Sequence, residues 1–436
     1  MCIICKEKTL PRLLQELNCS ECHDITHIYD LPYLLKEFNC VGCIELVQLP
    51  NVLPLFIEWF YCSDCIKLTQ ISLLSFSLKE LDCSGCISLT YLPELPRSLV
   101  KLDCSGCIGI TRVPELPLSL KEFYCSGCTF LLRLPELPHT LEWLCCSGCI
   151  NLMRLPDLPQ TLKKLDCSGC VCITWLPVFP KKMKWLSCSG CVGISKIDIL
   201  PKDLRGFDCS GCFSLSRLPE IPEMLDWIDF SGCVRVTMLP ECSITALRKI
   251  YCNGCHGLES LPPLPLFLRD LDCSNCINLL RMDIECIKLQ WLNCTGCTSL
   301  LFLRVKSNEM IGFDCTDCTE LRSLDVSTST LIRFNCRNCV RLKTLPKFYD
   351  SLTRLDCNGC NNLIFVSNLT RAYLCVNMLE IIDNNYLEWR KEQTLYWFSS
   401  KTGLLYEDLI RRTWHPDRVV DWCWDTEEVK WFKSLR

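Results

Sequence analysis

The sequence lacks a strong excess of either charge and has no long apolar run. Lys and Arg number 46 and Asp and Glu number 50, for a net charge of −4, so there is no basic stripe of the kind that nucleic-acid-binding domains carry. No apolar run approaches the roughly 18 residues that cross a bilayer. Lys6, Glu7 and Lys8 stand within Met1–Leu10, where a signal peptide needs an apolar stretch. We therefore expect a cytoplasmic protein with neither a nucleic-acid nor a membrane partner.

Cysteine, by contrast, is abundant, at 41 residues. Most of it lies in one repeated phrase, written Cys-Ser-Gly-Cys at Cys83–Cys86, and one copy has Phe230 in place of its first cysteine. A period of 20–50 residues is the signature of a solenoid, which overrides the usual domain count for a chain of 436 residues. The copies are spaced 21 residues apart, except for two gaps of 22, with first cysteines at positions 19, 40, 62, 83, 104, 125, 146, 167, 188, 209, 252, 273, 294, 315, 336 and 357.

One repeat unit predicts a short strand, a turn and an extended return leg. With Leu78 as position 1, apolar residues occupy positions 1, 4, 6, 12 and 15, and cysteine occupies positions 6 and 9. The alternation predicts a strand that buries positions 4 and 6 and exposes positions 3, 5 and 7. Gly85 permits a tight turn that brings Cys86 inward. Leu92–Pro96 predicts a polyproline-like return leg, because proline lacks a donor and restricts its neighbour.

This pattern resembles the leucine-rich repeat, Leu-x-x-Leu-x-Leu-x-x-(Asn or Cys)-x-x-Leu, over about residues 10–366. The short unit with Leu-Pro-x-Leu-Pro is most similar to the type III secreted leucine-rich-repeat effectors of bacterial pathogens. The resemblance implies a mostly-β solenoid of the α/β type, a horseshoe with a parallel sheet on its concave face and an extended convex side. The departure is cysteine at position 6, where an aliphatic residue is usual, and cysteine packs as a small hydrophobe.

The ends of the chain depart from the repeat. We expect an N-terminal cap at 1–13, about 17 leucine-rich repeats at 14–370, and a helical, Trp-rich cap or docking segment at 371–436. The last segment contains His415–Asp417, the tripeptide with which J-domain cochaperones engage their partner, and it resembles tails on repeat proteins of giant DNA viruses. It is too short for the ligase domain that similar bacterial effectors can carry, so the resemblance does not imply that activity.

The cysteine spacing also has chemical interpretations. Cys83-x2-Cys86-x17-Cys104-x2-Cys107 satisfies a zinc-ribbon spacing rule, and Cys-x-x-Cys occurs in redox sites. The spacing recurs between almost all neighbouring copies, however, so no two copies are singled out, and Phe230 would break one site. Stacked cysteines about 4.8 Å apart could form disulfides, which a reducing cytosol opposes. We interpret the thiols as reduced core residues that hold no metal or cofactor.

The outward positions 3 and 5 carry the candidate binding residues. Tryptophans on a rigid sheet are typical interface anchors, although they could instead cover the neighbouring strand. A row of aspartates could attract a basic partner segment, or be a solvated face. Lys101, Lys164 and Lys249 at position 3 are expected to offset part of the repulsion between the aspartates. The candidate partner-binding residues are Trp59, Trp143, Trp185, Trp227, Trp291, Asp82, Asp103, Asp166, Asp208 and Asp229.

The function predicted from these features is a non-enzymatic, monomeric scaffold that binds a partner protein on the concave face. Two alternatives remain. One is a substrate-recognition adaptor that recruits ubiquitin-ligase or chaperone machinery through residues 371–436. The other is a metal- or redox-active protein that uses its many thiols directly.

Overall fold

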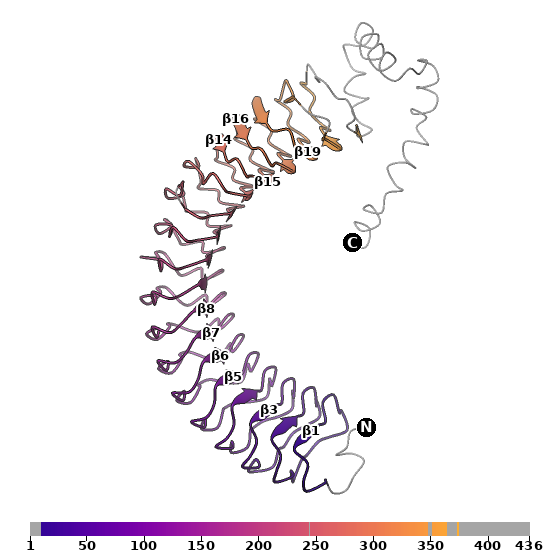
Figure 1. The fold of residues 1–436 in the computed structure, drawn as a ribbon, viewed down its shortest axis with the longest axis vertical. Coiled ribbons are helices and arrows are strands. Elements are labelled where there is room, and N and C mark those ends of the chain that lie inside the picture. Colours follow the sequence, from indigo (N-terminus) through magenta and orange to yellow (C-terminus); the bar gives the residue numbers. More distant parts are fainter. Residues whose placement is uncertain (1–9, 244, 348–350, 364–372, 375–436) are drawn as a thin grey trace, which may run out of the picture.

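The protein is a curved stack of parallel turns (Figure 1). The structure, a computed structural model, describes residues 10–243, 245–347, 351–363 and 373–374. Each repeat contributes one strand to an 18-stranded parallel sheet, which lies on the inner side of the arc. The predicted horseshoe with its sheet on the concave face is confirmed.

The strands of this sheet are short, and nearly all contain three residues. They are β1 (Glu16–Asn18), β2 (Glu37–Asn39), β3 (Trp59–Tyr61), β4 (Glu80–Asp82), β5 (Lys101–Asp103), β6 (Glu122–Tyr124), β7 (Trp143–Cys145), β8 (Lys164–Asp166), β9 (Trp185–Ser187), β10 (Gly206–Asp208), β11 (Trp227–Asp229), β12 (Lys249–Tyr251), β13 (Asp270–Asp272), β15 (Trp291–Asn293), β17 (Gly312–Asp314), β19 (Arg333–Asn335), β20 (Arg354–Asp356) and β21 (Tyr373–Leu374).

Equivalent positions of successive repeats pair with one another across the sheet. Leu81 of β4 pairs with Leu102 of β5, and Asp82 pairs with Asp103. The two gaps of 22 residues do not shift this register, since Phe38 of β2 still pairs with Phe60 of β3. A constant register keeps each side chain on its own face of the sheet, because a slip of one residue would exchange the two faces.

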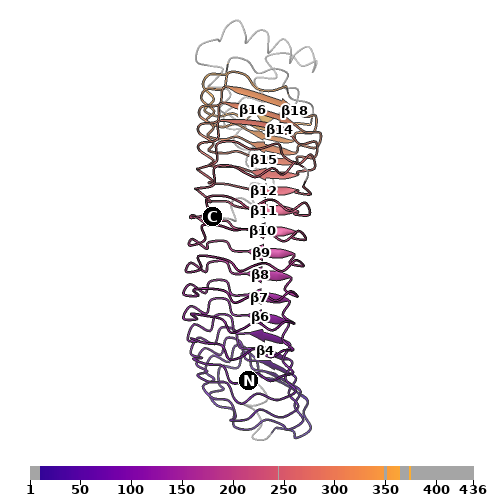
Figure 2. The ribbon, with the colours of Figure 1, turned by 90° about the vertical axis from the view of Figure 1, so that its left-hand side faces the viewer.

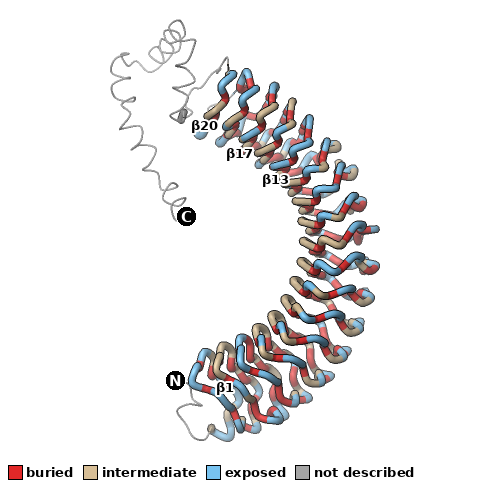
Figure 3. The backbone as a smooth tube through the Cα atoms, turned by 180° about the vertical axis from the view of Figure 1, so that it is seen from behind, coloured by how far each residue is buried: buried red, intermediate tan, exposed pale blue. Residues whose placement is uncertain are grey.

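The core is a continuous column of the same few positions. In the repeat that begins at Leu78, the residues at positions 1, 4, 6, 9 and 12 are fully buried, namely Leu78, Leu81, Cys83, Cys86 and Leu89. Buried residues recur in every turn of the stack, interleaved with exposed ones (Figure 3). Neighbouring repeats therefore close one another's apolar surface, as a solenoid requires.

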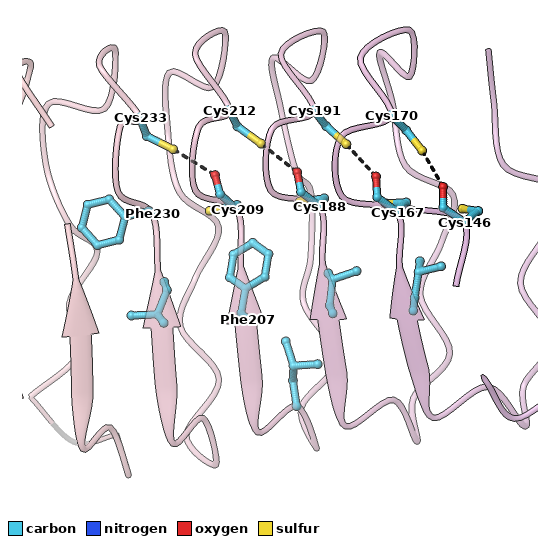
Figure 4. Close-up of a cluster of buried hydrophobic side chains, with 14 of the residues drawn as sticks. Cys146, Cys167, Cys170, Cys188, Cys191, Phe207, Cys209, Cys212, Phe230 and Cys233 are labelled. Atoms are coloured by element: carbon cyan, nitrogen blue, oxygen red, sulfur yellow. Dashed lines mark hydrogen bonds between the residues drawn. The ribbon is translucent and has the colours of Figure 1, made fainter. Parts of the chain in front are cut away.

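The position-9 cysteines join neighbouring repeats through hydrogen bonds. The Cys191 thiol donates to the backbone carbonyl of Cys167 in the preceding repeat, with Sγ and O 3.0 Å apart. Figure 4 shows four successive bonds of this kind. From Cys43 to Cys360 every position-9 cysteine donates in the same way, over 2.9–3.2 Å. We call this series the thiol ladder.

The thiol ladder explains why Phe230 is tolerated. The acceptor is a backbone carbonyl, so Cys255 donates to the carbonyl of Phe230 over 3.1 Å although that repeat lacks the position-6 cysteine. The Phe230 ring is itself fully buried. Position 6 thus needs an apolar side chain of variable size, whereas position 9 needs a buried donor.

Two substitutions separate these roles. Cys191→Ala and Cys188→Ala remove the same atoms from equally buried sites, but only Cys191 belongs to the thiol ladder. We expect Cys191→Ala to lower the free energy of unfolding by about 1 kcal/mol more than Cys188→Ala, the usual net value of one hydrogen bond. Urea unfolding measures both, and equal losses would contradict a role for the ladder bond.

The turn after each strand requires a left-handed residue. Position 8 has a positive φ in every repeat, and it is glycine in most of them. The exceptions are Glu21, Asp64, Asn275, Asp317 and Asn338, with φ between 55° and 59°. Asparagine and aspartate tolerate this conformation better than other non-glycine residues, which accounts for all of the exceptions except Glu21.

Substitutions of Gly148 measure the cost of the left-handed backbone conformation without the added cost of a steric clash. Its φ is +68°, and an added Cβ would approach no atom more closely than 3.6 Å, so a small side chain meets no steric obstacle. We expect Gly148→Ala to cost roughly 1–2 kcal/mol of stability and Gly148→Asn to cost less, because Asn275 already occupies this conformation. Thermal unfolding followed by circular dichroism would show the order, and an alanine variant as stable as the asparagine variant would contradict it.

The convex side is extended where the prolines occur, but three consecutive return legs form a second parallel sheet instead. These are β14 (Arg281–Glu285), β16 (Phe302–Lys306) and β18 (Ser323–Ser327), which lie on the convex face (Figure 2). These three legs are extended, as predicted, but they form a paired sheet in place of the polyproline-like backbone expected from the unit at Leu78. The reason is that these legs contain no proline, so every residue retains the N–H that a ladder needs.

The predicted boundaries at the two ends of the chain stay predictions. Tyr373–Leu374 form the short strand β21, which pairs with β20. The rest of 371–436, including His415–Asp417 and the virus-like tail, lies outside the described residues, as does most of the N-terminal cap. Within the described ranges there is no α-helix, and no helix that could cross a membrane was found there.

Candidate functional site

The concave surface consists of the first and third residues of the strands of the large sheet. All ten predicted binding residues lie on it. The five tryptophans open β3, β7, β9, β11 and β15, and the five aspartates close β4, β5, β8, β10 and β11. The two sets therefore form separate rows at opposite ends of the strands.

The aspartates have a structural role that the sequence did not suggest. Asp82 Oδ1 accepts the backbone N–H of Ser84 over 2.9 Å and its hydroxyl over 2.7 Å. This side-chain hydrogen bond to the residue two positions on defines an Asx turn. The same backbone bond is made by Asp103, Asp166, Asp208 and Asp229, and by asparagine at Asn18, Asn39, Asn293 and Asn335. Because asparagine serves equally, the turn needs an acceptor oxygen, not a charge.

The carboxylates are also less available than an exposed acidic strip would be. Burial raises the pKa of Asp103 and of Asp229, and the carboxylates of their neighbours Asp82 and Asp208 raise it further. Lys101 offsets part of this repulsion, as expected, because its positive charge lowers the pKa of Asp103. Its salt bridge, however, is with Glu80 at 2.6 Å and not with an aspartate of the row. The acidic row is thus half-buried and partly committed to the turns.

The tryptophans make several kinds of contact with their own sheet. The Lys164 ammonium lies 4.1 Å from the ring centroid of Trp143, a cation–π distance. Trp227 lies over Gly206 of the preceding strand, so closely that a Cβ at Gly206 would come within 2.6 Å of its ring. Trp291 covers Gly312 in the same way. Covering of a neighbouring strand therefore occurs at two of the five tryptophans, and only Trp291, at 45%, is strongly exposed.

An open depression lies between the tryptophans of β9 and β11. It has a volume of about 340 Å³ and is lined by Lys164, Lys184, Trp185, Arg205, Gly206 and Trp227. Gly206 belongs to its lining, and the Trp227 indole lies over this glycine because that strand has no side chain there. We call it the indole–cation depression, after its two tryptophans and its three cations, Lys164, Lys184 and Arg205.

The sequence analysis identified only part of this depression. It singled out Trp185 and Trp227 and considered Lys164 as a counter-charge, but it missed Lys184, Arg205 and Gly206. The available signal was a glycine at position 3 between two tryptophans at the same position, with basic residues just before β9 and β10. Position 2 precedes the strand, so the alternation of the strand gave it no predicted direction.

The cysteines of the described ranges form no disulfide, and all of them are buried except Cys145 and Cys172. Burial is the main cause that raises the pKa of Cys209, and it raises the pKa of Cys286 to about 12. By contrast, the hydrogen bond to Cys167 is the main cause that lowers the pKa of the ladder thiol Cys191. A thiol that donates in the ladder must carry its proton. No group of three or more Cys, His, Asp or Glu side chains in the described ranges is arranged to hold a metal ion.

Comparison with known proteins gives structural matches only. No family model matches the chain, and no curated protein matches it. A leucine-rich repeat protein from Bacteroides ovatus is 18% identical, with a TM-score of 0.39 over 64% of this chain and 88% of that one. YopM from Yersinia enterocolitica is 20% identical, with a TM-score of 0.37 over 84% and 79% of the two chains.

A third structure, YopM from Yersinia pestis, which is described as a leucine-rich effector protein, is 25% identical, with a TM-score of 0.42 over 64% of this chain and 77% of that one. The structural neighbours are thus leucine-rich repeat proteins, as predicted. The described residues form a leucine-rich-repeat solenoid by their own geometry, with one in-register strand per repeat and a buried position-9 side chain bonded to the preceding turn.

Substitutions of Asp103 distinguish its role as a hydrogen-bond acceptor in the turn from the effect of its negative charge. Asp103→Asn keeps the acceptor, so we expect it to be at least as stable as the wild type at pH 7, whereas Asp103→Ala should lose about 1 kcal/mol. Because the folded-state pKa of Asp103 is raised, its contribution to stability is full below its ordinary pKa and is lost as the pH rises through the raised value.

The gain from Asp103→Asn should therefore shrink as the pH falls into the acidic range. Urea unfolding at pH 7 and near pH 4 measures this change. A large loss of stability in the asparagine variant at pH 7 would contradict the Asx-turn role.

Proposed function

We propose that this protein is a scaffold that binds a partner protein on its concave surface. The observation that carries the proposal is the indole–cation depression, which Trp185 and Trp227 line together with Lys164, Lys184 and Arg205. Trp and Arg are the residues most enriched among the side chains that dominate binding energy. They stand on a sheet whose register is constant, so a partner would order few groups on binding.

The proposal is for binding rather than catalysis. Among the described residues, two large sets of potential nucleophiles and acids take part in folding, since the position-9 thiols donate to carbonyls and the aspartate row caps turns. The proposed scaffold uses no cofactor and acts as a monomer on a protein partner, not on nucleic acid. Free buried thiols support a reducing compartment such as the cytoplasm.

Trp175 provides a matched control for the binding surface. It is 51% exposed and belongs to a return leg, away from the strands of the concave sheet. A partner would first be identified by proximity labelling, then purified, and its affinity measured for Trp185→Ala, Trp227→Ala and Trp175→Ala. We expect each concave variant to weaken binding about 30-fold, as interface anchors do, and Trp175→Ala to leave the affinity unchanged.

Circular dichroism should be the same for all three variants, so that lost binding is not lost folding. Full affinity in both concave variants would overturn the proposal. So would a loss of binding confined to Trp175→Ala, because it would move the site to the return legs.

A further inference from the structure

We infer that the indole–cation depression binds an acidic segment of the partner, with carboxylates on Lys164 and Arg205 and one large apolar side chain between Trp185 and Trp227. This inference rests on the proposed function and specifies the chemistry of the partner. The aspartate row suggested a basic partner segment, whereas the depression favours an acidic one. The two differ because the aspartate row lies at the other end of the strands.

Two of the three cations of the depression, Lys164 and Arg205, lack the carboxylate partners that equivalent residues have elsewhere. In the N-terminal half, a lysine at position 2 or 3 typically pairs with a glutamate exactly one repeat earlier. Lys101 pairs with Glu80 at 2.6 Å, and Lys163 pairs with Glu142 at 2.5 Å. The sequence places glutamate 21 residues before each of these lysines, so their charges are neutralised within the surface.

In the depression this pattern is broken. The residue 21 positions before Lys164 is Trp143, and the residue 21 positions before Arg205 is Lys184. Lys184 pairs with Asp203 at 3.1 Å. Arg205 donates only to the Met224 carbonyl, over 3.4 Å. Within the described part of the chain, neither Lys164 nor Arg205 has a carboxylate partner, so two positive charges remain for a ligand.

Nearby acids do not cancel these charges. Asp208 stands at the far end of β10, where its two oxygens accept hydrogen bonds from Ser210 and Ser187 over 2.7–3.1 Å. Asp226 lies one repeat beyond Arg205 but pairs with Arg248 at 3.3 Å. Each of these carboxylates already has its own partners, so an incoming carboxylate would be the natural partner for Lys164 and Arg205.

The shape of the site favours a short peptide over a nucleic acid. The depression spans β8 to β11, roughly 15 Å at the usual strand spacing, which an extended segment of about five residues covers. The aspartate row runs parallel to it along the same strands. A nucleic acid carries a charge on every phosphate and would meet that row, whereas a peptide can place isolated carboxylates on the cations alone.

The test uses the full-length protein and two amidated pentapeptides labelled with a fluorophore, Glu-Glu-Phe-Glu-Glu and Lys-Lys-Phe-Lys-Lys. Fluorescence anisotropy should show binding of the acidic peptide only, weakened by added salt. Lys164→Gln and Arg205→Gln should each weaken it about two- to five-fold. Lys101→Gln and Lys249→Gln are the matched control for Lys164→Gln, because those lysines occupy the same strand position as Lys164 but have carboxylate partners. They should leave binding unchanged.

Several outcomes would overturn the inference. These are no binding of the acidic peptide at millimolar concentration, equal binding of both peptides, or equal losses in the test and control variants. Tighter binding of an oligouridylate that is lost in Lys164→Gln would also overturn it and assign the site to nucleic acid. With the identified partner protein, loss of binding in Trp185→Ala but not in Lys164→Gln or Arg205→Gln would leave the scaffold standing and reject only the acidic segment.

Discussion

The whole molecule depends on one contact, the hydrogen bond from a buried thiol to a carbonyl of the preceding repeat. Each turn would otherwise present that carbonyl to an apolar core, where only the N–H of its own turn could reach it, as Cys170 does for Cys167. The thiol supplies a second donor from the next repeat. A thiol is small enough to stack at every turn. This bond joins each repeat to its neighbour at the turn, in addition to the pairing of their strands.

Because the register is constant, equivalent positions of successive repeats form rows on the concave surface. A residue that changes in one repeat therefore always meets the same position of the next repeat. Glutamate and lysine one repeat apart neutralise each other. A glycine beside a tryptophan receives the indole, as at Gly206 and Gly312. Where tryptophan or a second cation replaces the glutamate, a charge is left without a partner. A binding site can therefore arise in a repeat array without any insertion. It is sufficient that one repeat lacks the glutamate that elsewhere pairs with a lysine of the next repeat.

The sequence was sufficient for the fold and for the placement of the site residues, but not for their roles. Period, strand position and core followed from alternation and spacing, because burial of Leu81 or Cys83 is a property of the repeat. The role of Asp103 did not follow, because an outward aspartate and a turn-capping aspartate occupy the same position, and only the bond to Ser105 distinguishes them. Arg205 was missed because position 2 lies outside the strand. The sheet of β14, β16 and β18 was missed because the prolines of one unit were taken to represent all units.

That second sheet changes what joins successive repeats on the convex side. Beside the described proline-containing legs the pairing is limited to isolated bridges, as between Val52 and Leu73, because proline has no N–H to donate. Along β14, β16 and β18 both sides of the stack are hydrogen-bonded in register. Proline in the return legs therefore determines, repeat by repeat, where the convex side can form a sheet.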